Sequence, residues 1–211
     1  MGREFVEIFD KWVHTYDDSV SGHDPEYAAV FENYEGILEA VAKRAASPVV
    51  EFGTGTANLT AELLKRGHEV VGIEPNGAMR SAAKEKFPEL LLLDGDFLDF
   101  NLPDSPKSFV SSYAFHHLTD EEKAEAIQRY ASILPPGGKV VFADTVFESE
   151  EAKQGRIVYE EGEGHLNLVE DLKREYYTTV PVLKAIFEKN GFDIDFTQMN
   201  DYVILMDATK R

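Results

Sequence analysis

The stretch VVEFGTGTANLT, residues 49–60, decides the fold class of this chain. Apolar residues of strand type run directly into a turn that contains Gly53 and Gly55, and a helical segment follows. Glycine allows the backbone to turn sharply and to approach a ligand closely, and the start of the helix presents unpaired N–H groups to that ligand. The pattern indicates a cofactor-binding loop. A tight strand-to-helix turn without a ligand is the alternative that the loop alone leaves open.

Outward from this loop, short apolar runs alternate with helical segments, a pattern typical of βαβ units and of a parallel sheet buried on both faces. The predicted helices cover residues 58–66, a segment that begins near Asn76, and residues 119–134, where Thr119 and Glu122 form a capping box. The predicted strands are residues 49–52, 69–74, 90–93, 108–113 and 139–144.

The C-terminal end departs from this alternation. FDIDF (192–196) and YVILMDA (202–208) are separated by only a few residues. Strands joined so closely must be antiparallel, because a parallel crossover needs a dozen or more residues. We therefore predict a Rossmann-like α/β fold with a mostly parallel seven-stranded sheet, an antiparallel last strand and helices on both faces.

The region before the sheet is predicted to be helical. Apolar residues recur at helical spacing over residues 3–13, and a second helix is expected from Pro25, capped by Asp24, to about Ala45. We expect one domain over residues 1–211, with residues 1–46 as an N-terminal helical cap or lid and residues 47–211 as the α/β core. The stretch from Glu160 to Gly164 is expected to be a mobile acidic loop.

Composition limits the possible partners. The 211 residues carry 21 Lys and Arg against 39 Asp and Glu, a formal net charge of −18, which repels nucleic-acid phosphates. The absence of cysteine excludes disulfides, a thiolate nucleophile and a cysteine-based zinc site. The N-terminus is too charged for a signal peptide, and no apolar run is long enough to span a bilayer. We expect a cytoplasmic protein that binds neither nucleic acid nor membrane.

Two acidic residues refine the prediction for the loop. Glu51 lies two positions before Gly53, and Glu74 ends the next strand, where Rossmann-type sheets place a carboxylate that accepts the ribose hydroxyls. A ribose-bearing cofactor is therefore predicted. A dinucleotide fingerprint requires a small residue at the position of Asn58, and this argues against a nicotinamide oxidoreductase.

The pattern Glu51-x-Gly-x-Gly-x-Ala57 resembles motif I of the class I S-adenosylmethionine (SAM)-dependent methyltransferases, although glycine is usual at the position of Ala57. The resemblance extends over nearly the whole chain, and its closest group is the bacterial YrrT-like methyltransferases. It is carried by FDKWVHTYDD (9–18), GIEPN (72–76), DGDF (94–97), SSYAFHHLTDEEK (111–123), LPPGGKVVFADTVF (134–147) and FTQMNDYVILMDATK (196–210).

This resemblance implies roles for individual residues. Gly53 would line the methionine part of SAM, with Gly55 in the same loop, and Glu51 would reach the methionine end through water. Glu74 would hold the ribose hydroxyls. Asp96 would bind the adenine amino group, with Phe97 beside the ring; on spacing alone, Asp96 could also be a turn-forming residue that follows a strand.

The acceptor side is less defined. Methyl transfer from a sulfonium is a direct displacement, so the enzyme mainly aligns acceptor, methyl and sulfur, and needs a base only if the acceptor must lose a proton. Tyr113, His116 and His117 follow the fourth strand, at the edge where open α/β sheets hold their chemistry, and are the candidate bases. The neighbouring histidines make a poor chelating pair without a third ligand, so no metal is expected.

The N-terminal segment and the insertion near Tyr176 and Tyr177 are candidates for a lid over the acceptor pocket. Tyr16 lies in a turn and is the preferred lid residue, whereas Tyr27 and Phe31 fit a core stripe better. The sequence favours transfer of a methyl group from SAM to a small-molecule acceptor that it does not identify. The alternative is a sensor or partner protein that binds SAM without transferring a methyl group.

Overall fold

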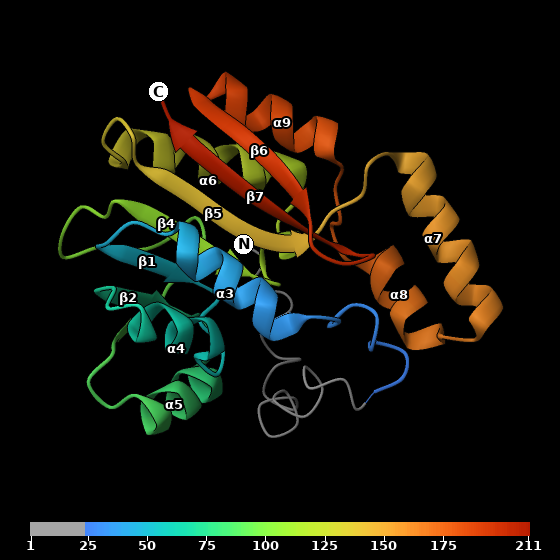
Figure 1. The fold of residues 1–211 in the computed structure, drawn as a ribbon, viewed down its shortest axis with the longest axis horizontal. Helices are drawn as coiled ribbons and strands as arrows, with labels where there is room; N and C mark the ends of the chain where they lie inside the picture. Colours follow the sequence, from blue (N-terminus) through green and yellow to red (C-terminus); the bar gives the residue numbers. More distant parts are fainter. Residues whose placement is uncertain (1–23) are drawn as a thin grey trace.

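A computed structural model describes residues 24–211 of the chain (Figure 1). Within this range, seven strands form one sheet in the order β3-β2-β1-β4-β5-β7-β6. The pairs among β1 to β5 are parallel, and β7 is antiparallel to both of its neighbours, β5 and β6. The strands are β1 Val49–Phe52, β2 Val70–Ile73, β3 Leu91–Leu93, β4 Ser108–Ser112, β5 Lys139–Thr145, β6 Phe192–Gln198 and β7 Val203–Lys210.

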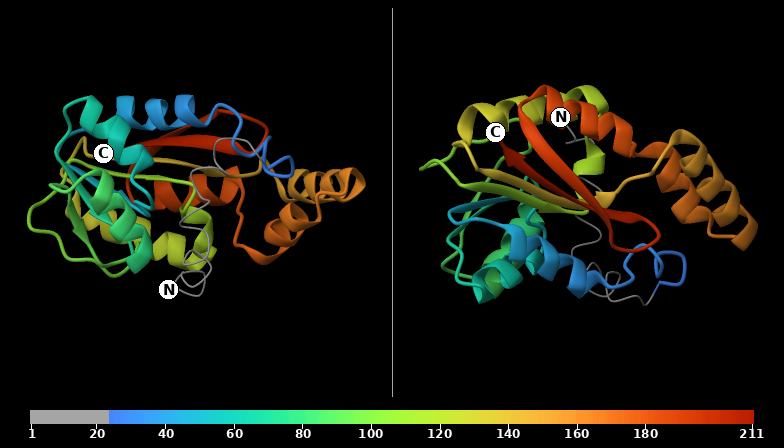
Figure 2. Two further views of the ribbon diagram at one scale, coloured as in Figure 1. Left: turned by 90° about the horizontal axis from the view of Figure 1, so that it is seen from below. Right: turned by 45° about the horizontal axis from the view of Figure 1, so that its top comes forward.

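Helices cover both faces of this sheet (Figure 2). The alternation of side chains along the strands explains why both faces need cover. In β1, Val49 belongs to one hydrophobic cluster and Val50 to the other, and Phe109 and Val110 of β4 divide in the same way. The helices are α3 Tyr34–Arg44, α4 Asn58–Lys65, α5 Gly77–Lys86, the short 3₁₀ helix η3 Phe115–His117, α6 Asp120–Ile133, α7 Glu150–Glu163, α8 Leu166–Arg174 and α9 Val180–Lys189.

The cluster that contains Val50 is covered by α6 and α9, and the cluster that contains Val49 is covered mainly by α3 and α4. Helix α3, which belongs to the predicted N-terminal helical cap or lid, therefore packs on the sheet. The face under α6 is rich in aromatic rings. Phe52 of β1 stacks on Phe109 and Tyr130 at centroid distances of 5.5 and 5.2 Å.

The predicted fold class is confirmed. Each of the five predicted parallel strands exists, with bounds that differ by one residue at most, and the reversed strand is β7. The capping box is present as well: Thr119 Oγ1 accepts the backbone N–H of Glu122 at 3.2 Å, and the Glu122 carboxylate accepts the N–H of Thr119 at 3.0 Å.

The predicted helix over residues 25–45 begins nine residues later than expected. Residues 25–33 form turns, and the helix α3 starts at Tyr34. Asn33 has a φ of 59°, a left-handed conformation that cannot continue a right-handed helix. The Asp24 carboxylate accepts the N–H of Glu26 at 3.0 Å, so it stabilises a turn rather than a long helix.

The predicted acidic loop at residues 160–164 is also wrong, because these residues form the end of α7 and its C-cap, Gly164. Glu160 is buried, and its carboxylate accepts hydrogen bonds from Tyr202 and pairs with His165 Nδ1 at 2.6 Å. Glu160 therefore has hydrogen-bond partners that the sequence of residues 160–164 does not reveal. Helices α7 and α8 project beyond the carboxyl end of β5 (Figures 1 and 2). No helix within residues 24–211 is long and apolar enough to cross a membrane.

Candidate active site

The glycine loop after β1 forms one wall of the candidate site. Gly53 and Gly55 have φ values of 63° and 54°, which glycine adopts without steric cost. A Cβ on Gly53 would lie 2.7 Å from the Cβ of Ala114, so the loop after β4 packs directly on this glycine. Ala57 is also left-handed, with a φ of 69°, and is buried. This left-handed conformation is one that glycine, the usual residue at this position of motif I, adopts most easily.

Glu74 follows β2 and joins this loop to the next helix. One carboxylate oxygen accepts the backbone N–H of Gly55, and the other accepts that of Asn76, each at 2.8 Å. The residue is only 6% exposed. Burial raises the pKa of Glu74 above its ordinary value, while the two backbone hydrogen bonds act in the opposite direction. The carboxylate is therefore fixed in position at the edge of the glycine loop.

Glu51 lies within β1 and is buried, with its carboxylate accepting a hydrogen bond from Thr60 Oγ1 at 2.5 Å. Burial, with a smaller contribution from the neighbouring charge of Glu74, raises the pKa of Glu51 to about 8 against the opposing hydrogen bonds from Thr60. Two buried carboxylates therefore lie beside the loop, where a positively charged ligand would stabilise their ionised forms.

Asp96 and Phe97 follow β3 in a tight turn. Asp96 Oδ1 accepts the backbone N–H groups of Leu98 at 2.9 Å and Asp99 at 2.8 Å, which is the turn-forming geometry considered in the sequence analysis. The ring of Phe97 is buried and stacks on Phe52 at a centroid distance of 5.1 Å. The core therefore occupies this ring, and any contact of Phe97 with adenine would involve its backbone.

Tyr113 follows β4 with a φ of 53° and packs its ring between Phe31 and Tyr34, at centroid distances of 5.2 and 5.5 Å. Burial raises the pKa of Tyr113 above its ordinary value, so the phenol stays protonated at neutral pH. Its hydroxyl lies 3.4 Å from the carbonyl oxygen of Val30. These contacts fit a packing role better than that of a base.

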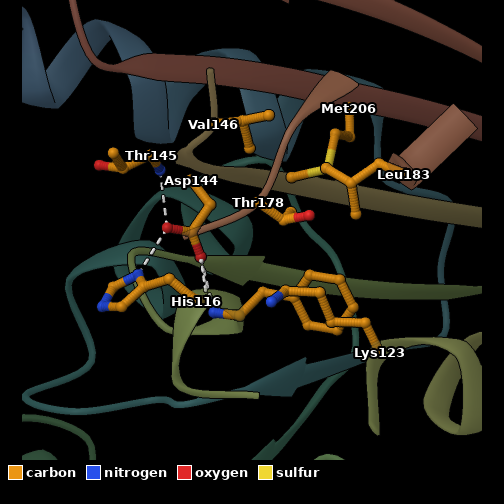
Figure 3. Close-up of a pocket in the computed structure, with 9 residues that line it drawn as sticks. His116, Lys123, Asp144, Thr145, Val146, Thr178, Leu183 and Met206 are labelled. Carbon is orange, nitrogen blue, oxygen red and sulfur yellow. Dashed lines mark hydrogen bonds and ion pairs between the residues drawn. The ribbon is translucent and has the colours of Figure 1, made fainter. Parts of the chain in front are cut away.

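His116 lies in η3 and is held by a carboxylate from the next strand. Its Nδ1 lies 2.6 Å from Asp144 Oδ1, and its backbone N–H donates to Asp144 Oδ2 at 3.1 Å (Figure 3). Burial lowers the pKa of His116, but Asp144 and Glu175 outweigh this effect and raise it to about 10. Asp144 also accepts the N–H groups of Phe115 and Thr145, so the strand end and the loop form one rigid unit.

On its other side, His116 meets residues from the connector between α8 and α9. His116 Nε2 lies 3.3 Å from Glu175 Oε2, and the Tyr177 ring stacks on the imidazole at 4.9 Å. His117 lies against His116, with ring centroids 4.2 Å apart, and burial lowers its pKa to about 3. Neither Asp144 nor Glu175 was predicted as a site residue, because Asp144 ends a predicted strand and Glu175 is 58 to 59 positions from the histidines.

The predicted lid is described only in part. Tyr16 lies outside the described residues. Tyr27 donates a hydrogen bond to Asp171 of α8 at 2.5 Å, and Glu26 accepts the N–H of Asn167 at 2.8 Å. Phe31 packs on Tyr34 and Tyr113, which agrees with the preference for a core role. The segment before α3 is thus fastened to α8.

Comparisons with known proteins place this geometry in a family. Residues 49–138 match the model of a methyltransferase domain. A protein from Anoxybacillus flavithermus, described as an uncharacterized methyltransferase, is 50% identical over 212 residues and is covered completely, as is this chain. A second such protein, from Exiguobacterium sibiricum, is 53% identical over 210 residues, which cover 100% of this chain and 99% of the relative.

The chain belongs to the SAM-dependent methyltransferases. The fold agrees with this assignment: magnesium protoporphyrin IX methyltransferase from Synechocystis, crystallised with S-adenosylhomocysteine, superposes with a TM-score of 0.72 at 17% identity. That alignment covers 97% of this methyltransferase and 98% of its neighbour. The predicted enzyme class and cofactor are confirmed, whereas membership in the YrrT-like group stays a prediction.

Proposed function

We propose that this methyltransferase binds SAM between the glycine loop after β1 and the turn that follows β3, and methylates a small-molecule acceptor at the carboxyl ends of β4 and β5. The observation that carries the proposal is the fixed carboxylate of Glu74. Its two oxygens already accept the N–H groups of Gly55 and Asn76, so the carboxylate is oriented before any ligand arrives. Such preorganisation reduces the cost of binding.

The residues of the site fit the cofactor in shape and in charge. The left-handed Gly53 lets the backbone approach the ligand without a Cβ. SAM carries a sulfonium and an ammonium, and the buried carboxylates of Glu51 and Glu74 complement these positive charges. We assign the ribose hydroxyls to Glu74, the methionine end to Glu51, Gly53 and Gly55, and the adenine end to Asp96 with the backbone of Phe97.

Two observations support a small acceptor. The net charge of −18 disfavours nucleic acid. The connector after α8 packs onto the loop after β4, because the N–H of Tyr176 donates to the carbonyl of His116 at 3.1 Å and Lys123 Nζ donates to that of Tyr176 at 2.7 Å. A site covered in this way admits a small molecule more readily than a polymer. When bound, SAM supplies an electrophilic methyl group, and the chain aligns the acceptor with it.

The cofactor site can be tested by calorimetric titration with SAM and S-adenosylhomocysteine. We expect binding in the wild type and a loss of at least about tenfold in affinity in Glu74→Gln and in Asp96→Asn, because each variant removes a carboxylate charge but keeps the shape. Glu85→Gln, an exposed carboxylate on α5, is the matched control and should bind normally.

The outcomes separate the steps of the proposal. Normal binding in Glu74→Gln would contradict the assignment of Glu74 to the ribose hydroxyls. Normal binding in Asp96→Asn would contradict the assignment of Asp96 to the adenine end and leave it only a turn-forming role. No binding in a folded wild type would contradict the proposed site as a whole. If the wild type binds SAM, formation of S-adenosylhomocysteine in a screen of small-molecule acceptors identifies the substrate class.

A further inference from the structure

We propose that His116, His117 and Glu175 bind a divalent transition-metal ion such as Zn²⁺ at the acceptor side of the site. One ligand atom from each of these residues lies within 4.8 Å of the other two. The sequence brings the two histidines together, and the fold adds the third ligand from the connector after α8. Two imidazoles and one carboxylate form a ligand set that catalytic zinc sites use while they keep a position open.

The distance between His116 and Glu175 fits a metal bridge. Nε2 and Oε2 are 3.3 Å apart, whereas a charge-assisted hydrogen bond is usually about 2.7–2.9 Å. Two ligand atoms that each lie about 2.0–2.1 Å from a tetrahedral ion are separated by roughly 3.3 Å. An ion between these two atoms would take the place of the proton on His116 Nε2, without a large movement of either side chain.

The surroundings of the cluster resemble the outer sphere of a metal site. Asp144 Oδ1 faces His116 Nδ1 at 2.6 Å, so Nε2 is left to face the ion, and a carboxylate behind a ligating histidine is the usual arrangement. The Tyr177 hydroxyl donates to Glu175 Oε2 at 2.8 Å, while Arg174 pairs with the other oxygen, Oε1, at 3.5 Å. His116 is thus oriented by Asp144, and Glu175 is oriented by Tyr177 and Arg174.

The cluster lies close to the cofactor loop. Ala114 is two residues before His116, and it packs against Gly53 at the methionine end of the proposed SAM site. This step rests on the proposed function. A metal ion at this place would favour acceptors that carry a hydroxyl or a thiol, because coordination lowers the pKa of such a group.

The reaction then balances with SAM as its only co-reactant. The O–H or S–H bond of the acceptor breaks, and its proton leaves to water. The acceptor oxygen or sulfur forms a bond to the methyl carbon while the carbon–sulfur bond of the sulfonium breaks and its electron pair stays on sulfur. The products are the methylated acceptor and S-adenosylhomocysteine.

Metal binding to the untagged protein tests the proposal. After treatment with a chelator, the wild type should bind about one equivalent of Co²⁺ with the visible absorption of a low-coordinate site, and Zn²⁺ should displace it. His117→Gln and Glu175→Gln should lose this binding. Tyr177→Phe keeps the stacked ring but lacks the hydroxyl, so we expect Co²⁺ affinity to fall about 10- to 100-fold.

His165→Gln provides the matched control, because His165 and Glu160 lie 2.6 Å apart but belong to no group of three possible metal ligands within residues 24–211. This variant should bind Co²⁺ as the wild type does. A wild type that binds SAM but neither Co²⁺ nor Zn²⁺ overturns the metal site and leaves the proposed function intact. Equal Co²⁺ affinity in His117→Gln, Glu175→Gln and the wild type also overturns it. SAM binding by each variant shows that it has folded, and Tyr177→Phe keeps the test valid if a ligand variant unfolds.

Discussion

At the scale of single residues, the site depends on carboxylates whose environment opposes their charge. Glu51 is buried within β1, and burial raises its pKa to about 8 from an ordinary value of 4.5. Between these two values the folded state binds a proton that the unfolded state has lost. Glu51 therefore destabilises the fold increasingly as the pH rises from about 4.5 to 8, and the full cost remains above pH 8.

Glu51→Gln should remove this cost. The shift corresponds to a few kcal/mol, about 1.4 for each unit of pKa, so the variant should be more stable than the wild type at pH 9 and equally stable near pH 4.5. Urea unfolding at pH 5, 7 and 9 measures the difference. Affinity for the SAM cation should rise through pH 8 in the wild type and stay nearly constant in the variant. Parallel pH profiles of stability for both proteins would show that Glu51 is ionised throughout.

Gly53 tests the close approach of the backbone to the cofactor. Gly53→Ala places a methyl 2.7 Å from Ala114 Cβ in a left-handed conformation, and SAM affinity should fall at least about tenfold because the loop must shift. Gly67→Ala is the matched control: Gly67 is also left-handed, with a φ of 79°, but a Cβ there meets nothing within 4 Å. Both variants should lose about 1–2 kcal/mol to backbone strain, and only Gly53→Ala should lose SAM binding in a calorimetric titration.

At the scale of elements, the connector between α8 and α9 joins the helices α7 and α8 to the rest of the fold. Lys123 of α6 is 1% exposed, and its ammonium donates to the carbonyl oxygens of Leu118 and Tyr176. Lys153 of α7 donates to the next carbonyl of the connector, that of Tyr177, at 2.9 Å. Lys123 in the protein interior and Lys153 near the surface therefore donate to the adjacent carbonyls of Tyr176 and Tyr177.

Lys123→Met should loosen the connector far more than Lys153→Met. Removal of Lys123 leaves the buried carbonyl of Leu118 without this donor, at a cost of about 1–3 kcal/mol. Water can replace the ammonium of the half-exposed Lys153, so its loss should cost less than about 1 kcal/mol. Hydrogen exchange at residues 175–178 and the free energy of unfolding measure the effect. A larger change in Lys153→Met would show that α7, rather than α6, holds the connector.

The sequence was sufficient for the elements whose signals are local. The alternating apolar runs predicted β1 to β5, and the short link before Val203 predicted the reversed β7. The late start of α3 could not be predicted, because Asn33 takes a left-handed φ within an apolar stripe whose helical spacing continues on both sides of it. Likewise, the contacts that bury Glu160 and that bring Glu175 to His116 join distant positions, and a one-dimensional pattern does not encode them.

At the scale of the whole molecule, the dominant quantity is the net charge of −18. Like charges spread over one folded body repel one another and favour the expanded state. The ion pairs at the surface offset this only slightly: Lys65 with Glu62 and Lys184 with Glu188 are pairs between exposed or half-exposed side chains, a kind that contributes about 0–1 kcal/mol.

Salt should therefore stabilise this methyltransferase. An increase in NaCl from about 0.01 M to about 0.5 M shortens the Debye length from about 30 Å to below 8 Å, which screens repulsion across the molecule more than it weakens contacts at 3–4 Å. We expect the midpoint of thermal unfolding at pH 8 to rise by several degrees, and KCl to act equally because screening does not depend on the cation. At pH 5, near the sequence pI of about 4.7, the net charge is small and the rise should nearly vanish. A midpoint that falls with salt at pH 8 would mean that the surface ion pairs contribute more to stability than the net repulsion removes.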